Sequence, residues 1–163
     1  MGIVLQYIGD SKRIKSRVRQ HCTGNVESSA LRKTIAEKMG FEIHTTKRPS
    51  GSRKTSVHPL SAEKLISEYI QSGTWKIIPC RTVEEAKDFQ WYGIDKKRPP
   101  LNKYMQFWDE NNESRYQILL DELLDSDFIE FESTLDISTE PGVYSLWHEN
   151  TPSDFAETRI GYD

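Results

Sequence analysis

Three features are scarce or absent in this chain of 163 residues, and each argues against a class of protein. Cysteine occurs only twice, as Cys22 and Cys80, without a Cys-x-x-Cys pair, so a disulfide framework or a zinc site is not expected. No run of eighteen apolar residues is present, so no membrane span is expected. The N-terminus has no apolar segment like that of a secretory signal peptide. Together these absences favour a reduced, cytoplasmic setting.

The length favours a single domain over residues 1–163, with enough chain for a sizeable core. Apolar periodicity and Gly or Pro breaks predict helices that alternate with strands, which is typical of an α/β or α+β fold. Ser28 and Ser61 are expected to cap the second and third helices. Segment 47–59, rich in Lys, Arg, Ser and Gly, is expected to be a mobile loop. Strands are expected at 3–8, 41–46, 75–80, 128–135 and 143–148, and helices at 12–22, 28–39, 61–73, 82–93 and 112–127.

Charge is distributed unevenly, although the net charge is only -3. Residues 1–103 carry 20 Lys and Arg against 10 Asp and Glu, whereas residues 104–163 carry 2 against 15. A basic half suits a polyanion, because neutralising phosphates releases their counterions. The acidic part could cover the back of the fold, or shield the basic face until DNA displaces it. The asymmetry equally fits two faces that attract each other within the fold.

The most informative pattern lies near the N-terminus, where Tyr7-Ile8-Gly9 is followed by Arg17 and His21. A turn after Gly9 would begin a helix on which Arg17 and His21, at positions i and i+4, share one face. Tyr7 would end the preceding strand and point at the same spot. Arginine supplies a permanent charge for a phosphate oxygen, tyrosine a hydroxyl and histidine a proton carrier. The spacing therefore predicts that these side chains converge on one phosphate.

Residues 7–21 resemble the second core motif of the GIY-YIG nucleases. Segment 98–102, Arg-Pro-Pro-Leu-Asn, is similar to the family's closing motif, and segment 141–144, Pro-Gly-Val-Tyr, to its opening GIY motif. The resemblance implies a small mixed or antiparallel sheet flanked by helices. It implies a restriction-enzyme-like endonuclease that hydrolyses phosphodiester bonds of double-stranded DNA with Mg²⁺ or Mn²⁺. A homodimer is a further expectation, because cutting both strands with one site per chain needs two chains or two encounters.

The resemblance also implies roles for five residues. Tyr7 would activate or position the attacking water, and Tyr144 would hydrogen-bond that water or the phosphate. Arg17 would stabilise the negative charge of the pentavalent transition state. His21 would orient Tyr7 or carry a proton, and Asn102 would hold the backbone near the metal site or contact phosphate. Each residue also has a structural alternative. The tyrosine rings could simply pack in the core, and Arg17 could be a solvated cation. His21 could make a structural hydrogen bond, and Asn102 could be a turn residue.

The motifs do not follow the family's order. In the family the GIY strand precedes the YIG strand and pairs with it as a hairpin, whereas here the GIY-like tripeptide is at 142–144 and the YIG tripeptide at 7–9. Joining Asp163 to Met1 would restore the family order, which suggests a circular permutation with Met105 as a plausible original start. This requires the two strands to lie side by side at a surface hairpin. The alternative is that the tripeptide at 142–144 belongs to an ordinary strand.

The chain also departs from the family at the metal ligand. In the family a Glu binds the metal, twelve residues before the terminal Asn in many members, and here that position is Gln90. A neutral amide oxygen is a much weaker Mg²⁺ ligand than a carboxylate. Gln90 could be an engineered inactivating change, a natural loss that leaves a binding module, or not the ligand position. Glu85 is the nearest alternative ligand, although Thr82 and Glu85 also form a Thr-x-x-Glu capping box.

Ten further residues are expected to contact DNA. Eight are basic, and the two serines begin a helix whose free N–H groups could bind phosphate. They are Lys12, Arg13, Lys15, Arg19, Ser28, Ser29, Lys47, Arg48, Arg53 and Lys54. A non-catalytic DNA-binding module on a nuclease scaffold and a protein-interaction domain are the alternatives to the nuclease.

Overall fold

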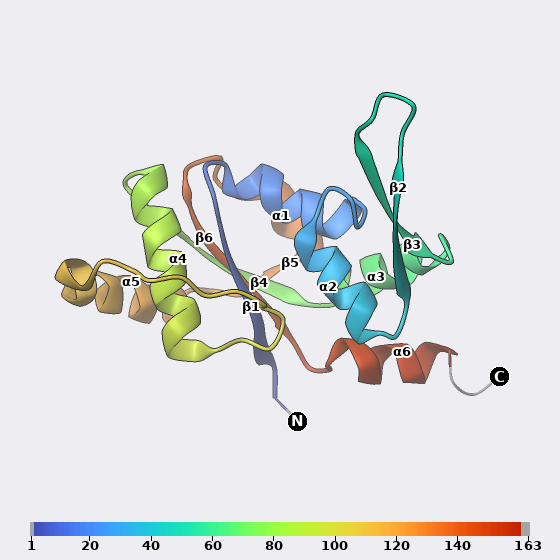
Figure 1. Ribbon diagram of the computed structural model, residues 1–163. Helices are drawn as coiled ribbons and strands as arrows, with labels where there is room; N and C mark the ends of the chain where they lie inside the picture. The colour runs from blue at the N-terminus through green and yellow to red at the C-terminus, as the bar shows by residue number, and fades with distance from the viewer. Residues whose placement is uncertain (1, 161–163) are drawn as a thin grey trace.

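The computed structural model describes residues 2–160 and shows a sheet with helices on both faces (Figure 1). The elements are β1 (Val4–Ser11), α1 (Ile14–Thr23), α2 (Ala30–Lys38), β2 (Glu42–Lys47), β3 (Arg53–His58), α3 (Ala62–Gln71), β4 (Thr74–Pro79), α4 (Val83–Lys97), α5 (Glu113–Asp125), β5 (Ile129–Glu130), β6 (Gly142–His148) and α6 (Pro152–Ile160). Short 3-10 helices lie at Glu110–Asn112 and Phe131–Asp136. None of the described helices is both long and apolar enough to cross a membrane.

The central sheet has the strand order β1-β6-β4-β5, and each neighbouring pair is antiparallel. This confirms the expected α/β class with a small antiparallel sheet. β1 forms one edge of the sheet, and β6, which comes late in the chain, lies between β1 and β4. The strands with the YIG and GIY-like tripeptides are therefore direct neighbours, with Gly9 opposite Tyr144.

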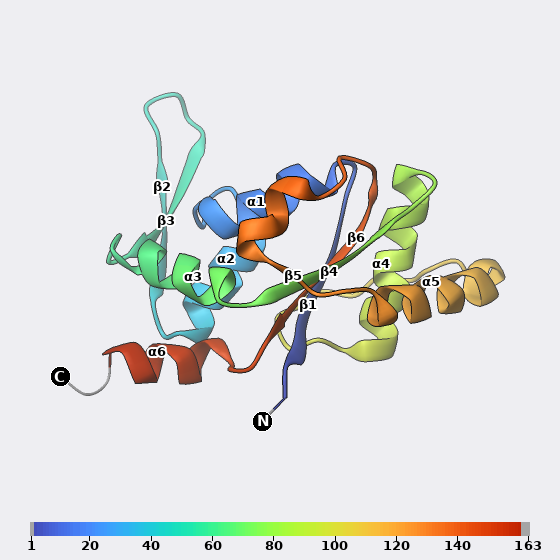
Figure 2. The ribbon, with the colours of Figure 1, turned by 180° about the vertical axis from the view of Figure 1, so that it is seen from behind.

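Two hydrophobic clusters lie on opposite faces of this sheet. Successive side chains of a strand point to opposite faces, so neighbouring residues join different clusters. Tyr7 and Tyr144 pack toward α1, α2 and α3, whereas Ile8 and Val143 pack toward α4 and α5. Figure 2 shows α1 and α5 from behind, on either side of the strands. The alternation places the tyrosines of both motifs on the face covered by α1.

The expectation of a mobile loop at 47–59 is wrong over residues 53–58, because β3 forms there and pairs with β2, the strand expected at 41–46. The pairing runs from Glu42 opposite His58 to Lys47 opposite Arg53. Val57 and the threonines of both strands favour extended structure, although the density of basic residues and Gly suggests a loop. The hairpin extends well beyond the helices (Figure 1). The tip of the hairpin therefore holds basic residues away from the rest of the protein.

Other element boundaries also differ from the expected ones. The strand expected at 128–135 is only Ile129–Glu130, because a 3-10 helix follows it. The fourth helix continues to Lys97, since Gly93 allows close packing on β1: a Cβ there would lie 3.3 Å from Ile8 Cδ1. The sequence did not predict α6.

Two of the expected caps are also different. Ser29 rather than Ser28 caps α2, accepting the N–H of Arg32 at 3.1 Å. The Ser61 side chain makes no capping bond at the start of α3.

Candidate active site

Four of the predicted catalytic residues lie together where β1 and β6 meet α1. The ring centroid of His21 lies 6.0 Å from that of Tyr7 and 5.4 Å from that of Tyr144. The two tyrosine rings are 6.3 Å apart. The charge of Arg17 acts on both tyrosines and on His21. The i, i+4 spacing on α1 and the β1–β6 pairing thus bring these side chains to one place.

Gly9 is what allows Tyr144 to reach this place. A Cβ at Gly9 would lie 2.5 Å from both Cζ and Oη of Tyr144. Real side-chain carbons do not approach so closely, so the tyrosine ring occupies the space that any other residue would fill. The glycine of the YIG tripeptide and the tyrosine of the GIY-like tripeptide therefore fit each other across the strand pair.

A buried hydrogen-bond chain runs through His21. Its Nε2 lies 2.8 Å from Tyr144 Oη, and its Nδ1 lies 2.6 Å from Ser29 Oγ. Burial lowers the pKa of His21 well below its ordinary value, and the charges of Arg17 and Arg32 lower it further. The imidazole is therefore neutral near pH 7, with one nitrogen donating and the other accepting. In one tautomer of His21, Nε2 donates to Tyr144 Oη, and in the other it accepts from that hydroxyl, so the tautomer sets the direction of the hydrogen bond at Tyr144.

The hydroxyls of both tyrosines are protonated in the free protein. Burial raises the pKa of Tyr7, against the opposing effect of Arg17, and it raises that of Tyr144 well above the ordinary value. Neither is thus a ready-made base near pH 7. The half-buried Tyr7, which lines a cavity, can orient a water molecule or a phosphate oxygen by hydrogen bonding. Tyr144 is fully buried, and its hydroxyl bonds His21.

Arg17 is half-buried and held in position. Its Nη1 donates to Gln20 Oε1 at 2.5 Å and to the Ser28 carbonyl at 3.0 Å. Gln20 lies on α1 itself, and Ser28 lies in the segment between α1 and α2. The guanidinium is therefore positioned beside the tyrosines and makes no ion pair among the described residues, although its charge interacts with that of Asp10.

Asn102 fixes the exposed edge of β1. Its side-chain oxygen accepts the N–H of Ile8 at 2.9 Å, and its side-chain nitrogen donates to the carbonyl of Ile8 at 2.9 Å. The amide thereby replaces a neighbouring strand next to Tyr7. This geometry gives Asn102 a positioning role, and its side chain has little capacity left for a phosphate.

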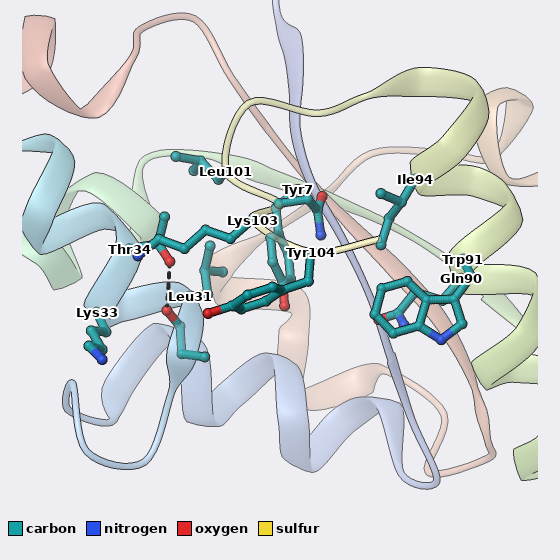
Figure 3. A pocket seen from close by; sticks show the side chains of 12 residues that line it. Tyr7, Leu31, Lys33, Thr34, Gln90, Trp91, Ile94, Leu101, Lys103 and Tyr104 are labelled. Atoms are coloured by element: carbon teal, nitrogen blue, oxygen red, sulfur yellow. Dashed lines mark hydrogen bonds between the residues drawn. The ribbon is translucent and has the colours of Figure 1, made fainter. Parts of the chain in front are cut away.

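Gln90 lines a cavity of about 170 Å³ beside Tyr7. It lies on the face of α4 that also carries Gly93 and Ile94, so the helix packs this face against β1. Figure 3 shows Gln90 and Trp91 on the α4 side, Leu31 and Thr34 on the α2 side, and Tyr104 between them. The cavity is lined by Tyr7, Ala30, Leu31, Lys33, Thr34, Gln90, Trp91, Ile94, Leu101, Asn102, Lys103 and Tyr104.

The residues present do not fit Mg²⁺ at this position. Gln90 offers a neutral oxygen, and within residues 2–160 no group of three or more His, Cys, Asp and Glu side chains could hold a metal ion. The carboxylate that influences both Tyr7 and Tyr144 is Asp10, which no motif in the sequence singled out. Burial raises the pKa of Asp10, while Lys87 opposes this. In the sequence, the position of Asp10 directly after the YIG tripeptide is the feature that could have drawn attention to it.

The structure does not bring Glu85 to the tyrosines. Its backbone N–H donates to Thr82 Oγ1 at 3.0 Å, and its carboxylate accepts the N–H of Arg81 at 3.0 Å and faces Arg115 at 3.5 Å. These contacts point toward α5, and Glu85 lines a different cavity from that of Gln90. The N-cap at Thr82 is therefore present, although the Glu85 carboxylate bonds Arg81 instead of completing the reciprocal capping box.

The expected DNA contacts divide into exposed and occupied groups. Ser29 is fully buried, so its hydroxyl serves His21 and the N-cap rather than DNA. Arg19 donates to Thr134 Oγ1 at 2.8 Å, and Arg48 pairs with Glu27. Ser28 and Lys15 are half-buried. The exposed members are Lys12, Arg13, Lys47, Arg53 and Lys54.

Comparison with known proteins identifies a family. Residues 2–120 match the GIY-YIG catalytic domain. The matched region contains β1, α1 and α4 with their candidate residues, whereas β6 with Tyr144 lies outside it. No curated protein and no solved structure matches the chain. Since the match covers well over half of the sequence and includes the residues gathered around Tyr7, the chain belongs to the GIY-YIG catalytic domain family of nucleases, which hydrolyse phosphodiester bonds.

Proposed function

We propose that the chain is a restriction-enzyme-like DNA endonuclease scaffold that acts on double-stranded DNA, and that Gln90 keeps its hydrolytic activity low. The observation that carries this proposal is the convergence of Tyr7, Tyr144, Arg17 and His21 on one face of β1 and β6. A carboxylate at position 90 would supply the ligand for Mg²⁺ or Mn²⁺, and the bound ion would stabilise charge on the phosphate. Plasmid cleavage by a Gln90→Glu variant tests it.

A second reading is a DNA-binding module that retains the scaffold without hydrolysis. Gln90 favours it, because the amide lacks the charge that a divalent metal requires. Both readings require DNA binding, and they differ in whether a restored glutamate produces cleavage. We place the protein in the cytoplasm, where its two buried, free cysteines would stay reduced. As an enzyme it would act as a dimer, with one site for each strand.

We further propose that the chain is a circular permutation of the family order. The C-terminal end of β6 at His148 lies opposite the beginning of β1 at Val4. Joining the two ends of the chain would therefore restore the family's strand pair, with α6 in the long connection between the strands. A reordered chain, with residues 104–163 followed by 1–103, is expected to fold with a thermal midpoint within about 5 °C of the original. Opening the chain inside β4 serves as the control, because β4 is an internal strand. Failure of the reordered chain to fold would contradict the permutation.

The hairpin β2–β3 is suited to DNA, because a two-stranded ribbon fits the major groove. Its tip carries Lys47, Arg53 and Lys54, all exposed. Replacing these three by Gln is expected to reduce the slope of log affinity against log salt by about 0.9 per charge removed. Fluorescence anisotropy with a labelled duplex measures this. The Arg159→Gln variant of α6, away from the hairpin tip in Figure 1, should leave the slope unchanged. Equal effects at both places would contradict a hairpin interface.

A further inference from the structure

The cavity beside Tyr7 is lined by a polar side chain, the amide of Gln90. Gln90 is only 8% exposed as a residue. The amide both donates and accepts, which matches the edge of a nucleobase.

Aromatic side chains accompany this amide. Trp91 is half-buried in the cavity wall, whereas Tyr104 is 77% exposed, and its ring lies between the α2 and α4 sides in Figure 3. An exposed aromatic ring beside a hydrogen-bonding group is an arrangement that stacks on bases. The volume of about 170 Å³ is well below the roughly 300 Å³ of small drug-sized sites, so it suits one ring system.

Positive charge surrounds the same opening. Lys33 and Lys103 line the cavity, and Lys103 pairs with Glu37 at 2.8 Å with both side chains partly exposed. Within the described residues, Lys33 has no carboxylate partner and remains available for a phosphate. A base entering this cavity would thus bring its own phosphates to cationic groups and to the neighbourhood of Tyr7.

We propose that this cavity takes one unpaired nucleobase of bound DNA, stacked on Tyr104 and Trp91 and hydrogen-bonded by Gln90. The inference rests on the proposed function, since it requires that DNA binds near Tyr7. It specifies the substrate as a duplex with an unstacked or displaced nucleotide at the site. Such a base costs less to accommodate when it is already unpaired, so the protein prefers a duplex with a single bulged nucleotide.

The test is an anisotropy titration of the full chain in EDTA, which prevents cleavage, with labelled duplexes that have or lack one bulged nucleotide. The unchanged protein is expected to bind the bulged duplex about tenfold more tightly. Tyr104→Ala should remove this preference and leave affinity for the regular duplex nearly unchanged. The matched control is Phe107→Ala, three residues along the same segment, because Phe107 is fully exposed and does not line the cavity.

A 2-aminopurine at the bulged position gives a second readout, because stacking on the aromatic rings quenches its emission. The quench should persist in Phe107→Ala and disappear in Tyr104→Ala. Equal affinity for both duplexes would overturn the base cavity while leaving DNA binding intact. A preference that survives Tyr104→Ala would also overturn it. If neither duplex binds at low salt, the proposed function and this inference both fail.

Discussion

Replacing Gln90 by glutamate is expected to raise Mg²⁺-dependent nicking of supercoiled plasmid by at least about 100-fold. The substitution changes one neutral oxygen donor into a carboxylate of the same size at a position that already lines the cavity beside Tyr7. Mg²⁺ favours such a ligand, because it binds through one or two carboxylates together with waters and substrate phosphate. The side chains proposed to act on the phosphate already lie together: Tyr7, Tyr144, Arg17 and His21.

The comparison needs three proteins: the unchanged chain, Gln90→Glu and Glu85→Gln. Cleavage is measured with Mg²⁺, with Mn²⁺ and with EDTA. If only Gln90→Glu cuts and EDTA stops it, position 90 is the metal-ligand position. If the unchanged chain cuts equally well, that placement is wrong, and loss of cutting in Glu85→Gln would identify Glu85 as the ligand. Absence of cleavage in all three, with DNA binding intact, would support the binding module.

Local spacing explains why much of the site could be predicted from sequence. Arg17 and His21 share a helix face whenever residues 14–23 are helical, and Tyr7 precedes them on the adjoining strand. The resemblance of 142–144 to a GIY motif is sufficient to predict that Tyr144 lies near Tyr7. The β1–β6 register shows the physical basis, because Gly9 leaves room for the Tyr144 ring.

Contacts between distant segments could not be predicted in the same way. Ser29 joins His21 only because the segment after α1 turns back, and Asn102 pairs with Ile8 across 94 residues. The cavity depends on Trp91 and Tyr104, whose approach to α2 no periodicity reveals. The missed hairpin has another cause: its alternating Thr and Val residues carry the strand signal, but composition at the tip is typical of a loop.

The second large effect that we expect is a loss of cleavage rate when the charge of Arg17 is removed. In the Gln90→Glu background, Arg17→Ala should lower the cleavage rate by about 100- to 1,000-fold, the range seen when one group that stabilises transition-state charge is lost. DNA affinity should fall only severalfold, because Arg17 is half-buried and is one of many cations in the basic part. The measurement is a single-turnover rate with DNA saturated, so that chemistry is separated from binding.

Arg13→Ala is the matched control, because it removes the same charge from an exposed position at the start of the same helix. Arg17→Lys adds a second comparison: it keeps the charge but loses the planar guanidinium that bonds Gln20 and the Ser28 carbonyl. Thermal unfolding of each variant shows whether the segment between α1 and α2 remains intact. Arg17 acts on the transition state if its loss lowers the rate far more than the loss of Arg13. Equal losses would instead show that it contributes only general attraction for DNA, and the convergence around Tyr7 would then be structural.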